Sequence, residues 1–197
     1  MLKIIYRIFV PDFSKSAMEK VITLKDKSFG LYIHNEEIER AIDGVAASIN
    51  ADYKDSEDVP IVLCVLNGAL IFTAELLKRL EFNCELMSVK LSSYQGTAST
   101  GTVLNVLGIT GDVRGRRVII TEDIVDTGNT IVALKEMLLD KGAGDVRICT
   151  MLLKPDVYKK SVKLDYVGME ISNEFIVGFG LDYDELGRNY KDIYKII

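Results

Sequence analysis

The sequence has few of the residues that carry metal or histidine chemistry. Its 197 residues include one histidine, His34, no tryptophan, and three cysteines, Cys64, Cys84 and Cys149. The cysteines are isolated in apolar stretches and form no CxxC pair. This argues against structural zinc and against Cys-His or Ser-His catalysis, and it favours reduced thiols in a cytoplasmic protein. We therefore expect His34 to be a partly exposed structural residue.

The sequence also lacks the marks of membrane and nucleic-acid binding. No apolar run approaches the roughly 18 residues of a membrane span. The apolar start of the chain is interrupted by Lys3 and Arg7 before Pro11, so we predict no signal peptide. The chain has 24 Lys and Arg against 29 Asp and Glu, a net charge of −5, which disfavours sequence-independent binding to nucleic acid. Its length suits a single domain.

Short apolar runs alternate with amphipathic helices along the chain. A helical stripe is expected to begin at Asn35 as its cap, and others to lie near residues 70–80 and 131–139. The runs that read as strands are 61–66, 84–91, 103–109, 117–121, 146–153, 166–167 and 175–179. The strand-helix-strand order predicts a parallel sheet. Residues 1–30 show no clear period, and the C-terminus reads as polar.

Residues 92–102 (SSYQGTASTGT) stand out by composition. Eight of these eleven residues are Ser, Thr or Gly. Such a stretch has little apolar surface to bury, so composition alone predicts a slack surface loop.

The segment after residues 117–121 concentrates polar chemistry at the end of a buried strand. Glu122 and Asp123 are adjacent carboxylates that need hydroxyls, a metal or a cation as partner, and Asp126 adds a third acid. Residues 127–130 (TGNT) then offer hydroxyls and free backbone N–H groups at a helix start, which is a common phosphate site. A phosphorylated sugar would fit both ends. The alternative is an ordinary polar helix cap beside solvated acids.

The segment VIITEDIVDTGNT, residues 118–130, resembles the phosphoribosyl-pyrophosphate-binding motif of type I phosphoribosyltransferases. Further segments narrow the resemblance to hypoxanthine (hypoxanthine-guanine) phosphoribosyltransferases: VLNGALIF at 65–72, LSSYQ at 91–95, VKLDYVGMEI at 162–171 and EFIVGFGLDYDELGR at 174–188. The resemblance runs from about residue 33 to the C-terminus in order and spacing, and it leaves out the first 30 residues.

This resemblance implies an α/β fold in a single domain, residues 1–197. The expected fold is a parallel central sheet flanked by helices, a small hood from about 1–30 and 160–197, and a mobile lid at about 92–105. The implied reaction transfers a phosphoribosyl group from 5-phosphoribosyl 1-pyrophosphate to N9 of hypoxanthine, and of guanine, with Mg²⁺. It would yield IMP or GMP plus pyrophosphate in a homodimer or homotetramer. A xanthine-preferring enzyme and a non-catalytic, nucleic-acid-binding regulator remain as alternatives.

The resemblance also assigns roles to residues that would bind the donor. Asp126 is the expected acid or base at purine N7. The expected donor-binding residues are Glu122 and Asp123 for the ribose and Mg²⁺, Asp182 for a second Mg²⁺, Thr127, Gly128, Asn129 and Thr130 for the 5′-phosphate, and Leu66, Asn67, Gly68 and Arg188 for pyrophosphate. Many relatives carry Lys in place of Asn67, so the loop is expected to act through its backbone.

Three further residues are expected at the base. Lys163 matches the lysine that donates to the purine 6-oxo oxygen, Phe175 the aromatic that stacks on the base, and Ile176 a backbone contact. Ser93 and Tyr94 match a Ser-Tyr pair at the start of the closing lid. Closure would keep water from a donor that also hydrolyses.

Overall fold

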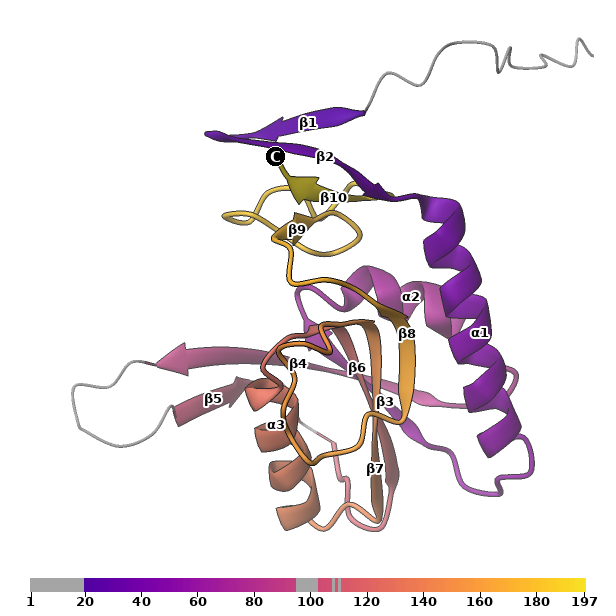
Figure 1. Ribbon diagram of the computed structural model, residues 1–197. Helices are drawn as coiled ribbons and strands as arrows, with labels where there is room; N and C mark the ends of the chain where they lie inside the picture. The colour runs from indigo at the N-terminus through magenta and orange to yellow at the C-terminus, as the bar shows by residue number, and fades with distance from the viewer. Residues whose placement is uncertain (1–19, 95–102, 108, 110) are drawn as a thin grey trace, which may run out of the picture.

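The computed structural model describes residues 20–94, 103–107, 109 and 111–197, with the backbone alone for 92–94 and 103–107. In this part of the chain a six-stranded sheet forms the centre, and a four-stranded sheet lies above it (Figure 1). The central sheet has the order β5-β4-β3-β6-β7-β8, with bounds β3 (Ile61–Leu66), β4 (Glu85–Tyr94), β5 (Val103–Leu107), β6 (Arg117–Val125), β7 (Asp145–Leu153) and β8 (Tyr166–Glu170).

The parallel sheet predicted from the sequence is confirmed. Strands β4, β3, β6, β7 and β8 are mutually parallel, and β5 pairs antiparallel with β4 at one side. The middle strands are apolar because helices cover both of their faces. In β3, for example, residues 61–65 are all buried.

Three helices cover the sheet: α1 (Asn35–Tyr53), α2 (Leu70–Leu77) and α3 (Asn129–Asp140). The first two pack on one face with Ile119 and Cys149 of the sheet. Helix α3 packs on the other face with Ile120 and Ile148. Alternate residues of the same strand therefore serve two separate cores. None of the helices in the described residues is long and apolar enough to cross a membrane.

The predicted cap of α1 is wrong by one residue. His34, which is extended and exposed as expected, precedes the helix, and its N–H donates to Glu37 Oε2 at 3.1 Å. Asn35 is already helical. Its N–H donates instead to Asp192 Oδ1 at 3.0 Å, so an acceptor from the far end of the chain replaces the local cap.

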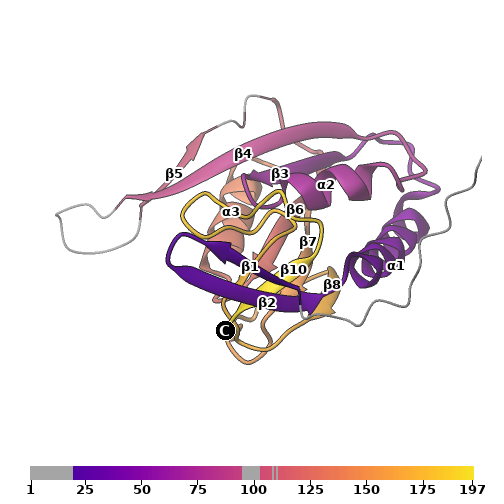
Figure 2. The same cartoon turned by 90° about the horizontal axis from the view of Figure 1, so that it is seen from above.

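The hood predicted from the two ends of the chain is confirmed as an antiparallel sheet with the order β1-β2-β10-β9. Its strands are β1 (Val21–Leu24), β2 (Lys27–Ile33), β9 (Ile176–Val177) and β10 (Ile193–Ile196). Seen from above, it lies over the central sheet (Figure 2). Although residues 20–30 show no clear period in the sequence, the structure places β1 and part of β2 there, and the C-terminus that reads as polar holds β10 with the fully buried Tyr194.

Strand β4 is longer than its composition predicts. The polar residues 92–94 stay in the strand and pair with β5, with Tyr94 opposite Val103. The two strands form an arm that projects from the sheet (Figure 1). Residues 95–102 of the expected lid and residues 1–19 of the expected hood lie outside the described residues.

Candidate active site

Two neighbouring carboxyl groups, the buried Glu122 and the half-buried Asp123, lie at the carboxyl end of β6. Glu122 is 9% exposed, and its Oε2 is buried without a hydrogen-bond partner. Burial raises the pKa of Glu122 well above its usual value, and the neighbouring charge of Asp123 raises it further. Burial also raises the pKa of Asp123. A carboxyl pair with a buried, unused acceptor is suited to ligand hydroxyls or a cation.

The loop after β3 lies directly against this pair. The Leu66–Asn67 peptide bond is cis, and a Cβ at Gly68 would overlap the Asp123 carboxylate. On its other side, the carbonyl oxygen of Gly68 touches Gly180 of the hood, again closely enough to exclude a Cβ. The predicted pyrophosphate loop, the acidic pair and the hood therefore meet at one point.

Arg188 and Asp182 reach the same point from the hood. Arg188 donates through Nη1 to the Gly180 carbonyl at 2.7 Å, and its Nη2 lies 2.6 Å from Asp182 Oδ1. Its Nε is buried without a partner. The Arg188 charge lowers the pKa of Asp123, although burial outweighs it. The site thus holds a cation with a spare donor beside the loop at Gly68.

The predicted phosphate loop forms a small cavity at the start of α3. Gly128 precedes the helix with φ of 77°, in the left-handed region that favours glycine. The cavity has a volume of about 110 Å³, and its lining includes Glu122, Asp126, Thr127, Gly128 and Thr130. The first N–H groups of a helix have no partner within it, so this loop can receive an anion.

A lysine that sequence reasoning missed lies beside Asp126. Lys154 directly follows β7 and is 8% exposed. Its Nζ lies 3.3 Å from Asp126 Oδ2 and 3.2 Å from Asn173 Oδ1. Its position after β7 could have predicted it. Strands β6 and β7 are parallel neighbours, so residues just beyond their carboxyl ends lie close together.

Lys163, by contrast, lies away from the site. Its side chain is 80% exposed and is paired with Asp165, whose own carboxylate accepts from the Ile148 N–H. Ile148 is six residues before Lys154 along β7, which is about 20 Å at roughly 3.3 Å per residue. The prediction for Lys163 is therefore wrong. The motif VKLDYVGMEI leads into β8 at its amino end, whereas ligand groups gather at the carboxyl end.

Phe175 and Ile176 lie where the chain enters the hood. Phe175 is 46% exposed, and its ring centroid lies 6.1 Å from Phe29 and 5.9 Å from Tyr183. Ile176 is buried in the core. Phe175 follows Asn173 by two residues, so its open ring is close in sequence to the partner of Lys154. Its geometry suits stacking on a planar ligand.

Ser93 and Tyr94 lie at the end of β4, where their backbones pair with Leu104 and Val103 of β5. The role predicted for them in lid closure stays a prediction. In the described residues, no group of three or more His, Cys, Asp or Glu side chains is placed to hold a metal ion. A cation at Glu122 and Asp123 would therefore need ligands from a bound molecule.

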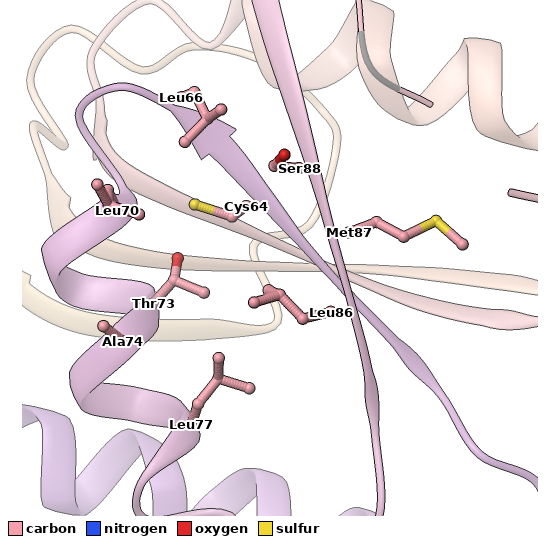
Figure 3. Close-up of a pocket in the computed structure, with 9 residues that line it drawn as sticks. All are labelled: Cys64, Leu66, Leu70, Thr73, Ala74, Leu77, Leu86, Met87 and Ser88. Atoms are coloured by element: carbon pink, nitrogen blue, oxygen red, sulfur yellow. The ribbon is translucent and has the colours of Figure 1, made fainter. Parts of the chain in front are cut away.

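A larger pocket shares only Leu66 with the predicted site residues. It has a volume of about 390 Å³ between α2 and β4, and most of its lining is apolar (Figure 3). Leu70 and Leu86 at its rim are 55% and 56% exposed. With few polar groups converging on it, this pocket lacks the means to orient a sugar phosphate.

Comparison with known proteins identifies the family and the fold. The family model described as "Phosphoribosyl transferase domain" matches residues 32–184. The hypoxanthine-guanine phosphoribosyltransferase of Streptococcus pneumoniae is 38% identical over 158 residues, which cover 80% of this chain and 87% of that protein. The enzyme of the same name from Lactococcus lactis is 47% identical over 131 residues, covering 66% of this chain and 71% of that protein. The chain belongs to the hypoxanthine-guanine phosphoribosyltransferase family.

Solved structures of this family share the fold. A Bacillus anthracis hypoxanthine-guanine phosphoribosyltransferase crystal structure superposes with a TM-score of 0.78 at 30% identity. The match covers 85% of this chain and 98% of that one. Family membership confirms the resemblance, the fold class and the classification of the chain as a transferase. The family model begins at residue 32, so it does not include most of the β1–β2 hairpin.

Proposed function

We propose that this protein is a purine salvage enzyme. It transfers the phosphoribosyl group of 5-phosphoribosyl 1-pyrophosphate to N9 of hypoxanthine, and of guanine, to give IMP or GMP and pyrophosphate. One observation carries the proposal. Asp126 lies within 3.3 Å of the buried Lys154 ammonium and also lines the phosphate-sized cavity of residues 122–131. The loop that would bind the 5′-phosphate therefore also carries Asp126, the residue that would face the base.

The donor would lie along the carboxyl edge of the sheet. The 5′-phosphate would bind at residues 127–130, with Gly128 allowing the turn into α3. Glu122 and Asp123 would accept hydrogen bonds from the ribose hydroxyls. The backbone of residues 66–68 and the Arg188 guanidinium would bind pyrophosphate, for which an arginine fork is well shaped.

The residues present fit Mg²⁺ with the donor, because the buried Glu122 Oε2 has no protein partner. Glu122 and Asp123 would hold the ion through the ribose, and Asp182 would hold a second one. When bound, Mg²⁺ neutralises negative charge on the leaving pyrophosphate. The buried acids would then be ionised beside a cation, which offsets the cost of their burial.

The base would lie between Phe175 and the loop of Asp126. Lys154 takes over the role first predicted for Lys163. Its ammonium donates and cannot accept, which suits a 6-oxo oxygen and disfavours a 6-amino group. Phe175 would stack on the ring, and the backbone of Ile176 would contact it.

Asp126 would handle the proton of the reaction. As purine N9 forms its bond to C1′ of the ribose, the bond from C1′ to the pyrophosphate oxygen breaks, and that electron pair leaves with pyrophosphate. The proton on N7 of the base passes to the Asp126 carboxylate. In the reverse direction Asp126 returns it.

A base panel tests the proposal. Purified protein is mixed with the donor, Mg²⁺ and one of hypoxanthine, guanine, xanthine or adenine, and nucleotide formation is followed by absorbance. We expect turnover of hypoxanthine and guanine and none of adenine. A preference for xanthine would support the alternative of a xanthine-preferring phosphoribosyltransferase. No turnover of any base, with the donor still bound, would leave the non-catalytic regulator as the better account.

The protein is also proposed to act as a homodimer or homotetramer in the cytoplasm. The exposed side chains of Leu70 and Leu86 beside one apolar pocket support self-association through this region. Free Cys64, Cys84 and Cys149 suit a reducing compartment. Light scattering during size-exclusion chromatography measures the mass, and a mass of 22.0 kDa would show a monomer.

A further inference from the structure

The Lys154 side chain is held from two sides. Its Nζ lies 3.3 Å from Asp126 Oδ2 and 3.2 Å from Asn173 Oδ1. An ammonium group has three donors and no acceptor, so the amide oxygen of Asn173 is the atom that faces it. Two of the three N–H groups thus point at acceptors from different segments. The third is left for a ligand.

The main chain of Lys154 is fixed as well. Its N–H donates to the Val125 carbonyl at 3.0 Å, and its own carbonyl accepts from the Val157 and Tyr158 N–H groups. What remains free is the four-carbon stem, which carries much of the rotamer entropy of a lysine. Of the two side chains that contact the ammonium, only Asp126 would remain if Asn173 were removed. That carboxylate is also the proposed proton acceptor.

Asn173 lies in the short segment that carries the aromatic base contact. Two residues before it, the Ile171 N–H donates to the carbonyl of Leu153 at 2.9 Å, which anchors the segment beside Lys154. Two residues after it comes Phe175, whose ring is 46% exposed. One segment therefore places both the stacking ring and the acceptor for the lysine.

We infer that Asn173 is a positioning residue for base recognition. It holds the Lys154 ammonium so that the third N–H points at the 6-oxo oxygen of the purine, and it shares that ammonium with Asp126, which would otherwise hold it alone. The inference rests on the proposed function, because it assigns Asn173 a part in the same base site. Asn173 acts on the substrate through Lys154 and needs no contact with it.

Steady-state kinetics with two bases test this role. For Asn173→Ala we expect the KM for hypoxanthine to rise about tenfold, the loss of one hydrogen bond to a charged group. The KM for the donor should stay within about twofold. The KM for unsubstituted purine, which lacks the 6-oxo group, should equal that of the wild type. Asn173→Asp keeps an acceptor in place and should restore hypoxanthine use. The neighbouring exposed Ser172→Ala is the matched control.

A double-mutant cycle separates this inference from a general effect on folding. In a Lys154→Met background, Asn173→Ala should cause no further loss with hypoxanthine, because the group it positions is gone. Additive losses, or equal losses with both bases, would overturn the inference. If the wild type turns over hypoxanthine and Asn173→Ala has the same KM for it, the inference about Asn173 fails while the proposed function stands. If the wild type turns over no base, the proposed function fails.

Discussion

The two edges of the central sheet are both rich in charge, but the charges are arranged differently. At the amino edge, Arg147 pairs with Asp52 and Asp145, and Arg117 pairs with Asp58. At the carboxyl edge, Glu122 is buried with an unused oxygen and Arg188 with an unused Nε. The charged groups of the first arrangement are paired within the protein, although the buried Tyr53 hydroxyl beside them has no hydrogen-bond partner. The second leaves donors and acceptors for something else to satisfy.

The amino edge shows how charge is used for structure. Tyr53 is stacked on Phe82 at 5.2 Å, and the guanidinium groups of Arg117 and Arg147 lie 4.5 and 5.4 Å from the centre of its ring. The Asp52 carboxylate also accepts from the Tyr166 hydroxyl at 2.7 Å. Lys163 belongs to this edge, which is why its charge has no place in base recognition.

Replacing Asp126 is the strongest way to break the carboxyl edge. Asp126→Asn keeps the shape but removes the proton acceptor, so we expect kcat to fall by about 10²–10⁴-fold. The KM for the donor should change little, because the phosphate loop stays intact. Initial rates over a matrix of both substrates measure the two effects. Unchanged kcat would remove Asp126 from the acid/base role.

Gly68→Ala tests the contact between the pyrophosphate loop and Asp123. The new Cβ would overlap the Asp123 carboxylate, so loop or acid must move. We expect kcat/KM for the donor to fall by about 10²-fold, a typical cost of a misplaced binding group. Gly44→Ala is the matched control, because nothing lies near its Cβ position within α1. It should raise stability by roughly 0.5–1 kcal/mol and leave kinetics unchanged.

Two lysine variants sharpen the comparison directly. Lys154→Met keeps the apolar stem and removes the ammonium, so kcat/KM for hypoxanthine should fall by roughly 10–100-fold. Lys163→Met, at the amino edge, should leave kinetics within error. Parallel assays with hypoxanthine as the varied substrate decide the matter. A loss with Lys163→Met and none with Lys154→Met would reverse our assignment of the purine-binding lysine.

The buried acid predicts a dependence of stability on pH. Burial raises the pKa of Glu122, so the folded protein without ligand binds more protons than the unfolded chain above the usual value of 4.5. Its stability therefore falls as pH rises through that range. Glu122→Gln should remove this loss and raise Tm by a few degrees at neutral pH, with little change near pH 4. Thermal melts across pH, without Mg²⁺ or donor, measure it; equal melting of both proteins at pH 7 would contradict it.

The middle of the fold and the donor half of the site could be predicted because their signals are local. The strand at 61–66 has the predicted bounds, and the acids at the carboxyl end of β6 lie at the edge where a parallel sheet places ligand groups. The hood strands carry weak local patterns, and their stability comes from partners far along the chain. Lys154 was missed for the same reason. Its meaning depends on the pairing of β6 with β7, whereas Lys163 belonged to a more recognisable motif.

The hood has a consequence for synthesis of the protein. Strand β2 ends at Ile33, and its neighbour β10 begins at Ile193, so nearly the whole chain separates two strands that pair directly. On the ribosome β2 must wait for β10, whereas β3, β4, β6 and β7 can already assemble with their helices. The hood is therefore completed last. A nascent chain stalled before β10 would hold the phosphate loop while lacking a finished base pocket.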